Sequence, residues 1–383
     1  MPPGPLHVVS VQTTAEKGGA EFSNVDLLRG LQERGSRVKL LTNKPELAEG
    51  SGVPVEPIEL GPKLSRRSVA HVALGFLPWF VRFVRALRRE RAEGGPIDVL
   101  WVHYKKEQFM AALVPRRLAR SVVWAEWGPV PFELRGGLAR RVYVAAARRA
   151  DWIMAISQST KRSIVALGVP DDKVEVLPNA INVTEVGFDP AARERVRAEW
   201  GAGPETFVAG CVSRLHVKKR NDVLVRALEH LDGDFLLVIA GEGDQEESLR
   251  RLAAPHGDRV RFLPTPRGVV GQVFSACDVA LFAPLPIEGS PRAVVMAQLV
   301  GRPVIATHRE GAEELVIDGT GTIATPPHDP VAVARVLDEY RRDPERRARE
   351  GQRAREHAVR RYDRRWIEER FESALRQAAG RGE

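Results

Sequence analysis

The chain is predicted to fold as an α/β protein of two Rossmann-like domains, each built on a parallel sheet with helices on both faces. Short apolar strands alternate with helical segments along nearly the whole chain, which is the pattern of parallel sheets. A glycine or cationic loop of the kind that binds phosphate follows a strand in each half. The length of 383 residues also favours two domains.

In the N-terminal half, each expected strand is a short apolar run followed by a helical unit. Gly18 and Gly19 make the first turn, and Gly35 ends the first helix. The expected strands are residues 6–13, 37–43, 97–104, 121–128, 151–157 and 173–182. The expected helical units are residues 20–35, 76–95, 108–119, 138–150 and 158–168.

The C-terminal half repeats this order after residues 185–204, which are polar and helical and are expected to connect the domains. The expected strands are residues 207–215, 235–243, 259–265, 278–284, 304–307 and 321–326. The expected helices are residues 220–231, 244–255, 268–276, 293–300, 329–362 and 364–379. The predicted domains are therefore 1–184 and 185–363, with a closing helix at about 364–383 that packs back on the first domain.

The composition is typical of an ordinary globular protein, with 43% hydrophobic and 28% charged residues. Cys211 and Cys277 each lie in an apolar run, so neither a disulfide framework nor a metal signature is expected. Neither a secretory signal nor an apolar run near the ~20 residues of a membrane span is visible, so a cytoplasmic location is expected. The content of arginine and alanine is typical of a GC-rich bacterial genome.

The net charge of +8 favours anionic ligands such as nucleotides and phosphates. No compact basic-aromatic motif is present, so nucleic acid is not an expected partner. The Arg- and Glu-rich region 339–373 alternates its charges at helical spacing, which favours a solvated helix face over a nucleic-acid arm.

Two cations follow the strand at 207–215 in the second predicted domain. Arg214 ends this strand, and Lys219 precedes the next helix. Because α/β ligands bind at the carboxyl edge of the sheet, these cations are placed to hold and neutralise the oxygens of a diphosphate. A solvated basic loop is the alternative interpretation.

Residues 284–307 form the most informative unit, with a turn, one acidic residue, a helix and a buried strand. Glu288 lies in the turn ahead of the apolar run 293–300. Such a turn offers a carboxylate to sugar hydroxyls and backbone N–H groups at a helix N-terminus to phosphate oxygens. The alternative is an acid that merely favours the start of the helix.

Candidate ligand-binding positions in the first predicted domain come after its strands. Gly18 and Gly19 let the backbone approach an anion at a helix N-terminus, although a plain turn stays possible. The remaining candidates end strands or begin loops: His103, Glu126, Trp127, Ser157 and Asn179. Helix capping is the favoured role for Ser157, and turn formation for Asn179.

These pieces, in this order, resemble the retaining, nucleotide-sugar-dependent glycosyltransferases of family four, which have the GT-B fold. The resemblance covers nearly the whole chain and depends on the order and spacing of seven stretches rather than on any single one. The matching stretches are residues 17–21, 150–182, 212–228, 238–243, 259–266, 276–284 and 288–307.

The resemblance implies that the C-terminal domain binds the donor nucleotide sugar and the N-terminal domain binds the acceptor, with transfer in a cleft between them. It implies that Arg214 and Lys219 hold the diphosphate and that Glu288 contacts the donor sugar. Further donor contacts are implied for Gly18, Gly19, Gly289, Ser290, Pro291, Arg292, Arg261, Phe262 and Leu263. Acceptor-side candidates are His103, Glu126 and Trp127.

The resemblance also implies a front-face displacement in which the departing phosphate helps to deprotonate the acceptor hydroxyl. Neither a protein nucleophile, a metal nor another cofactor is implied, so the protein supplies orientation and charge stabilisation. Uridine is the commonest nucleobase in the family, which makes a UDP-hexose the expected donor.

Two positions depart from the family pattern. Met296 stands where the family usually has a second Glu that contacts the ribose, and Met accepts hydrogen bonds only weakly. Gln298 is two positions away and points elsewhere on a helix. Trp127 stands where family members often carry a His near the donor sugar, and His103 could compensate.

Three alternatives stay open at this stage. The chain could be a nucleotide-sugar-binding protein with a decayed site. The acceptor could be a natural-product aglycone or an aminocyclitol, gripped through Trp124, Glu126, Trp127 and Glu133. The helix 76–95 could present Trp79, Phe80 and Phe83 to a membrane that carries a lipid-linked acceptor, although a domain helix with a buried aromatic face is favoured.

Overall fold

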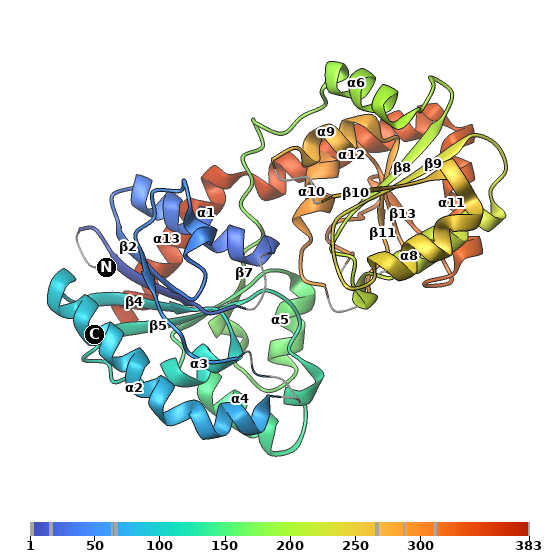
Figure 1. Cartoon of the computed structure of the whole chain (residues 1–383). Coiled ribbons are helices and arrows are strands. Elements are labelled where there is room, and N and C mark those ends of the chain that lie inside the picture. Colours follow the sequence, from blue (N-terminus) through green and yellow to red (C-terminus); the bar gives the residue numbers. More distant parts are fainter. Residues whose placement is uncertain are drawn as a thin grey trace. The chain divides into compact units, whose positions relative to one another are not determined.

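The computed structural model describes residues 4–14, 18–62, 64, 68–264, 268–285, 288–308 and 312–381 (Figure 1). The chain divides into two compact units. The first unit comprises Met1–Ala180 together with Arg364–Glu383, and the second comprises Ile181–Asp363. The first unit thus gives way to the second after Ala180, four residues before the boundary at 184/185 that the sequence suggests.

The first unit contains a seven-stranded, fully parallel sheet with the order β3-β2-β1-β4-β5-β6-β7. Its strands are β1 (His7–Gln12), β2 (Arg37–Thr42), β3 (Val55–Pro57), β4 (Ile97–Val102), β5 (Ala119–Glu126), β6 (Trp152–Ala155) and β7 (Val174–Val176). The short edge strand β3 was not predicted from the sequence, because three residues that include a proline carry almost no strand pattern.

Six helices cover the two faces of the first sheet. They are α1 (Gly19–Glu33), α2 (Val69–Gly94), α3 (Lys105–Ala111), α4 (Gly137–Ala147), α5 (Gln158–Val165) and α13 (Arg364–Arg381). Phe83 of α2, Met110 of α3 and Tyr143 of α4 share one apolar core with the sheet. Leu28 of α1 and Phe371 of α13 pack in the core on the other face.

The second unit contains a six-stranded parallel sheet with the order β10-β9-β8-β11-β12-β13. Its strands are β8 (Phe207–Val212), β9 (Phe235–Ala240), β10 (Val260–Leu263), β11 (Val279–Phe282), β12 (Val304–Ala306) and β13 (Gly321–Ile323). Its helices are α6 (Pro190–Trp200), α7 (Asn221–Ala227), α8 (Glu246–Ala253), α9 (Val270–Ala276), α10 (Arg292–Leu299), α11 (Pro330–Arg342) and α12 (Pro344–Tyr362). The prediction of two parallel-sheet, Rossmann-like domains is therefore confirmed.

The structure adds detail to two expectations about helices. Residues 185–204 are not merely a connection, because α6 buries Val196 and Trp200 in the core of the second unit. Residues 329–362 form two helices rather than one. Asp343 caps the second of them by accepting a hydrogen bond of 2.8 Å from the N–H of Arg346, and Pro344 begins it.

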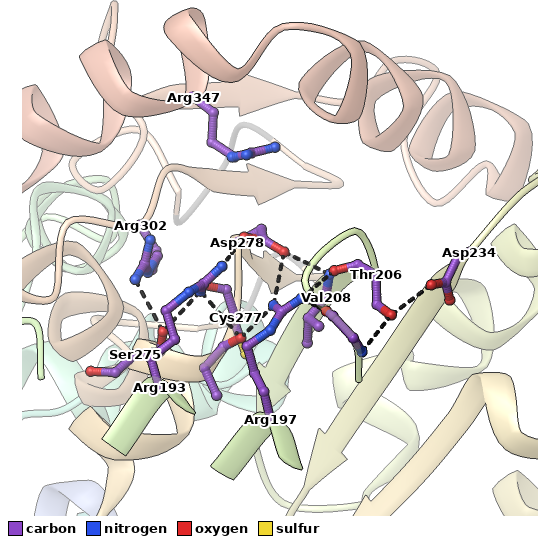
Figure 2. Close-up of polar contacts among 12 residues, drawn as sticks. Arg193, Arg197, Thr206, Val208, Asp234, Ser275, Cys277, Asp278, Arg302 and Arg347 are labelled. Carbon is purple, nitrogen blue, oxygen red and sulfur yellow. Dashed lines mark hydrogen bonds and ion pairs between the residues drawn. The ribbon is translucent and has the colours of Figure 1, made fainter. Parts of the chain in front are cut away.

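A buried carboxylate fixes α6 to the amino-terminal edge of the second sheet. Figure 2 shows Asp278, just before β11, between Arg193 and Arg197 of α6. The contacts measure 2.7 Å to Arg193 and 3.4 Å to Arg197, and the N–H of Val208 donates at 2.8 Å. Burial by itself would raise the pKa of Asp278, but the N–H of Val208 and the guanidinium of Arg193 outweigh it and lower the pKa.

Candidate active site

The strand order of the second sheet reverses between β8 and β11, so the loops after these strands diverge and leave a crevice at the carboxyl edge. Lys219 follows β8, and Glu288 follows β11. The Nζ atom of Lys219 lies 2.8 Å from Oε1 of Glu288. The N–H of Leu285 also donates to the carbonyl of Lys218 at 2.9 Å. The structure thus brings together a cation and a carboxylate that lie 69 positions apart in the sequence.

Arg214 lies on the loop after β8, and glycines of the neighbouring loop hold that backbone in place. Gly241 has a φ of +146°, and a Cβ there would lie 1.9 Å from the carbonyl oxygen of Ser213. A Cβ at Gly243 would lie 2.2 Å from the carbonyl oxygen of Leu215. Only glycine allows this close approach, so the segment after β9 shapes the loop that carries Arg214.

A small cavity of about 20 Å³ lies at this crevice. Its walls come from β8, α9, β11 and the segments that follow the two strands: Cys211, Val212, Ser213, Lys219, Phe274, Leu281, Phe282, Ala283, Pro284, Pro291 and Val294.

The four residues after Glu288 that were predicted to contact the donor lie at the start of α10. Gly289 is buried, Pro291 is the N-cap residue, and Arg292 begins the helix. Tyr362 of α12 hydrogen-bonds to Ser290. The segment therefore forms a helix N-terminus next to the Lys219–Glu288 pair, as the sequence suggested.

Two residues of α10 lie at or near the position where the family usually has a second Glu. Met296 is half-buried and packs against the apolar core. Gln298 is fully buried and donates to the carbonyl of Leu315. Gln298 is therefore turned away from the crevice, in agreement with the helical spacing.

The three residues expected near the nucleobase lie on the edge strand β10 and are half-buried. Arg261 donates to the carbonyl of Glu199 at 3.3 Å, and the guanidinium of Arg250 lies 4.8 Å from the ring of Phe262. Their side chains thus contact helices on the two faces of the sheet. Leu263 ends the strand, and its carbonyl accepts the N–H of Gly241 at 2.9 Å, which places its backbone beside the Arg214 loop.

The first unit has a larger pocket of about 210 Å³ at its own strand reversal, between β1 and β4. Residues at or after the carboxyl ends of β1, β3, β4 and β5 line it: Thr13, Leu64, His103, Tyr104, Lys105, Lys106, Glu107, Glu126, Trp127, Gly128, Pro129 and Pro131. All three predicted acceptor-side residues are among them. Trp124 is not, because it is fully buried in the apolar core.

The charged side chains of this pocket are paired with one another. Lys105 forms an ion pair with Glu126, whose Oε1 also accepts the hydroxyl of Tyr143 at 3.1 Å. The Lys105 and Glu126 side chains are only 14% and 5% exposed. Burial lowers the pKa of Lys105, while the Glu126 carboxylate opposes that shift. Glu126 is thus already neutralised within the pocket.

His103 and Trp127 form a second, uncharged pair. Their rings stack at 5.9 Å, and the indole N–H of Trp127 donates to Nδ1 of His103 at 3.1 Å. Because an indole only donates, His103 carries its proton on Nε2, which lies 2.9 Å from the hydroxyl of Ser10. Burial lowers the pKa of His103 to about 3, so the ring stays neutral and positions Trp127 rather than exchanging protons.

The start of α1 bears a carboxylate that the sequence did not single out. Gly18 is the N-cap residue of this helix, and Gly19 begins it; Lys17 of the same motif lies outside the described residues. Glu21, in the first helical turn, is buried and accepts hydrogen bonds from Thr14, at 3.1 Å, and from Tyr104.

The two other first-domain candidates are structural. Ser157 caps α5 by accepting the N–H of Thr160 at 3.2 Å, as predicted. Asn179 accepts the hydroxyl of Ser23 at 3.0 Å and so ties α1 to the segment after β7.

Sequence reasoning missed Lys105 and Tyr104, which follow His103 just after the end of β4. Their position after the end of a strand was the available signal, and the same rule had already selected Arg214. Tyr143 could not have been found in this way, because it reaches Glu126 from the buried face of α4.

Comparison with known proteins bears on these two sites. The family model "Glycosyltransferase Family 4" matches residues 17–185, and "Glycosyl transferases group 1" matches residues 192–357. The GDP-mannose-dependent alpha-(1-6)-phosphatidylinositol monomannoside mannosyltransferase of Mycobacterium tuberculosis is 31% identical over 284 residues, which are 66% of this chain and 70% of that protein. This chain belongs to glycosyltransferase family four. The resemblance identified from the sequence is confirmed.

Other relatives of this glycosyltransferase match over most of its length. The D-inositol 3-phosphate glycosyltransferase of Xylanimonas cellulosilytica is 28% identical over 368 residues, covering 88% of this chain and 86% of the relative. Among solved structures, Anabaena HepE in complex with UDP and glucose has a TM-score of 0.82 at 23% identity, covering 97% of this chain and 99% of HepE. Sucrose-phosphate synthase from Thermosynechococcus elongatus has a TM-score of 0.79 at 18% identity, covering 97% and 98%. These structures share the GT-B fold.

Two kinds of feature are absent from the described residues. Across the described ranges, no group of three or more His, Cys, Asp and Glu side chains is arranged to hold a metal ion. In the same part of the chain, none of the helices is both long and apolar enough to cross a membrane.

Proposed function

We propose that this glycosyltransferase moves a hexosyl group from a nucleoside diphosphate sugar to an acceptor hydroxyl with retention of configuration. The second unit binds the donor, and the first binds the acceptor. The observation that carries the proposal is the Lys219–Glu288 contact of 2.8 Å at the strand reversal of the second sheet. A cation there serves the diphosphate, and a carboxylate beside it serves the sugar hydroxyls.

Arg214 has the role of a second diphosphate cation in this mechanism. Arg214→Ala is expected to lower turnover by about 10²–10³, the usual cost of losing one group that stabilises transition-state charge. The control is Arg226→Ala, in the last turn of the neighbouring helix α7. Near-normal turnover of Arg214→Ala would refute the assignment.

The donor is proposed to be a UDP-hexose, with a GDP-hexose as the second candidate. The uridine proposal is supported by the resemblance and by the UDP bound in HepE. The guanosine candidate is supported by the GDP-mannose-dependent relatives. A thermal-shift panel of UDP-, GDP-, ADP- and TDP-sugars distinguishes them, because a ligand stabilises the folded state that binds it. A protein with a decayed site would show no slow hydrolysis of any of these donors.

The transfer is proposed to need no metal and no other cofactor. The cations that neutralise the departing diphosphate are then side chains, so EDTA is expected to leave turnover unchanged. A loss of turnover that Mg²⁺ or Mn²⁺ restores would contradict this.

The acceptor is proposed to carry a polyhydroxylated ring, such as a cyclitol, free or as part of a lipid. Paired charged groups that can hydrogen-bond to hydroxyls, beside the face of Trp127, make a pocket suited to such a ring. The names of the inositol phosphate and phosphatidylinositol mannoside transferases support the same class.

The sequence-based idea of a cationic acceptor is not carried forward. Glu126 is paired with Lys105, and Trp124 lies inside the core, so they cannot form the proposed acidic and aromatic wall. We expect an aminated cyclitol to have no advantage over its hydroxyl analogue in kcat/KM. A preference of tenfold or more for the amine would restore the earlier idea.

A further inference from the structure

Exposed large apolar side chains gather on one helix layer of the first unit. Leu74 is 86% exposed, Leu138 75%, Phe132 74% and Leu77 69%, and these are the four highest values for large apolar side chains in the described ranges. They lie on α2, on α4 and on the short turn before α4. Apolar residues grouped in this way mark contact surfaces more often than plain solvent-facing ones.

The outward stripe of α2 is apolar at its start and cationic further along. Its exposed members recur at helical spacing: Leu74, Leu77, Val81, Arg85 and Arg88. The aromatic side of the helix points the other way, because Phe83 is fully buried. Trp79 and Phe80 pack against the same core. Glu90 is buried too, so the stripe carries no exposed carboxylate before the last turn.

The outward face of α4 repeats this composition around a groove of about 530 Å³. Leu138 and Val142 are exposed on it, and the helix contains no acidic residue. Four exposed arginines line the groove: Arg135, Arg140, Arg141 and Arg148. Within the part of the chain that the structure describes, none of the four forms an ion pair with a carboxylate.

Both faces point away from the same core. Leu87 of α2 and Ala147 of α4 are buried in one apolar cluster against the first sheet. Figure 1 shows α2, α3 and α4 on the same side of that sheet. Leu113, just after α3, is 58% exposed and adds an apolar position to this layer. We treat the outer faces of α2 and α4 together as one surface, on which leucines lie among arginines that form no ion pair within the described residues, although Arg135 and Arg140 donate to the carbonyls of Val130 and Leu167.

We propose that this surface docks on a membrane rich in anionic phospholipids. The leucines enter the boundary between headgroups and acyl chains, and the arginines around the groove bind lipid phosphates. The arginines give charge complementarity to the bilayer. The exposed leucines distinguish this partner from a soluble polyanion, which would offer them no apolar contact. The proposal does not depend on which sugar is transferred or to which acceptor.

The test is co-flotation of the full chain with vesicles of phosphatidylcholine, with or without about a third of phosphatidylglycerol. Binding is expected only with the anionic lipid and is expected to fall as salt rises. Arg141→Glu is expected to weaken partitioning about tenfold or more. Leu138→Gln is expected to weaken it several-fold, because it removes apolar contact and leaves the charge unchanged.

Matched variants on the second unit serve as controls. Val331→Gln replaces a side chain that is 53% exposed on α11, and Arg349→Glu reverses an exposed charge on α12. Both are expected to bind vesicles like the unaltered protein. All four variants should keep the unaltered melting temperature and donor-hydrolysis rate, which separates this proposal from the proposed function.

Three results would count against the proposal. One is the absence of binding to anionic vesicles at low salt. Another is loss of binding in Arg141→Glu with full binding in Leu138→Gln, which would make the surface a site for soluble polyanions only. An equal loss in Arg349→Glu would count against the proposal as well, because it would show attraction by overall charge.

Discussion

The strand reversals of the two sheets occupy equivalent places but are filled differently. In the first sheet, between β1 and β4, a pocket of about 210 Å³ stays open. In the second, between β8 and β11, the cavity is about 20 Å³, and Lys219 in its wall pairs with Glu288. In the first pocket, the paired residues Lys105 and Glu126 both line the open space. In the second, the ion pair joins the loop after β8 to the loop after β11.

This difference shows which property follows from topology and which from the loops. Parallel strands that reverse order must leave divergent loops at one point, so each sheet has its crevice there. Loop length and side chains decide whether that crevice contains an open pocket or an ion pair. We infer that the first unit offers a preformed ring-binding pocket and that the second offers charges that exchange partners when the donor binds.

The largest expected effect is at the second crevice. Lys219→Ala should lower turnover by about 10²–10³, because it removes a cation from the departing diphosphate. Lys219→Arg should recover part of the loss, since the charge is kept. Steady-state kinetics measure both. Equal activity of Lys219→Ala and the unaltered enzyme would leave the ion pair without a catalytic role.

A second variant tests the opposite edge of the same sheet. Asp278→Ala leaves Arg193 and Arg197 without their buried carboxylate, and it should cost about 3 kcal/mol in the free energy of unfolding of the second unit. Urea unfolding followed by proteolysis measures this. Asp234→Ala, which removes an exposed acid bonded to Thr206, is the control and should cost less than about 1 kcal/mol. Similar costs for the two would contradict a special role for Asp278.

The paired charges of the first pocket can be tested by a double-mutant cycle. Lys105→Met should cost about 2–3 kcal/mol in stability, because it leaves Glu126 buried without its partner. Adding Glu126→Gln should recover much of that loss, since both charges are then gone. Thermal and urea unfolding report the coupling. Additive costs would mean that the two side chains act independently.

The last prediction concerns acid stability, and it is the one with the smallest effect at neutral pH. The pKa of His103 is about 3 in the folded state, below its ordinary value of 6.5, so the folded state binds fewer protons than the unfolded state between these values. Stability is therefore complete above pH 6.5 and falls by up to ~1.4 kcal/mol per pH unit as the pH drops towards 3. His103→Asn should flatten this slope. An unchanged slope would show that other groups cause the acid loss.

Most of the fold could be predicted from the sequence because strand and helix patterns are local. All twelve expected strands, in their order along the chain, follow from short apolar runs, and β3 was missed because it has almost no pattern of its own. The break at Asp343 and Pro344 was a readable signal, since proline after a capping residue begins a helix. The burial of α6 was harder to foresee, because its core contacts are few among polar residues.

The candidate sites were predicted where a residue lies at or just after the end of a strand, as with Arg214, His103 and Glu126. They were missed where a side chain comes from another element, as with Tyr143 of α4. The aromatic side of α2 shows the limit most clearly. Its composition suggested a membrane contact, but the exposed apolar stripe lies on another side of the same helix.

The sequence by itself determined the two parallel sheets, the family and the loops that carry the ligand groups, because strand periodicity and motif spacing are properties of neighbouring residues. Tertiary structure alone decided which charges meet, such as Lys219 with Glu288 and Lys105 with Glu126. It also decided which faces of α2 and α4 remain exposed. The reason is that pairing and burial depend on distances between residues far apart in the chain, which no local pattern records.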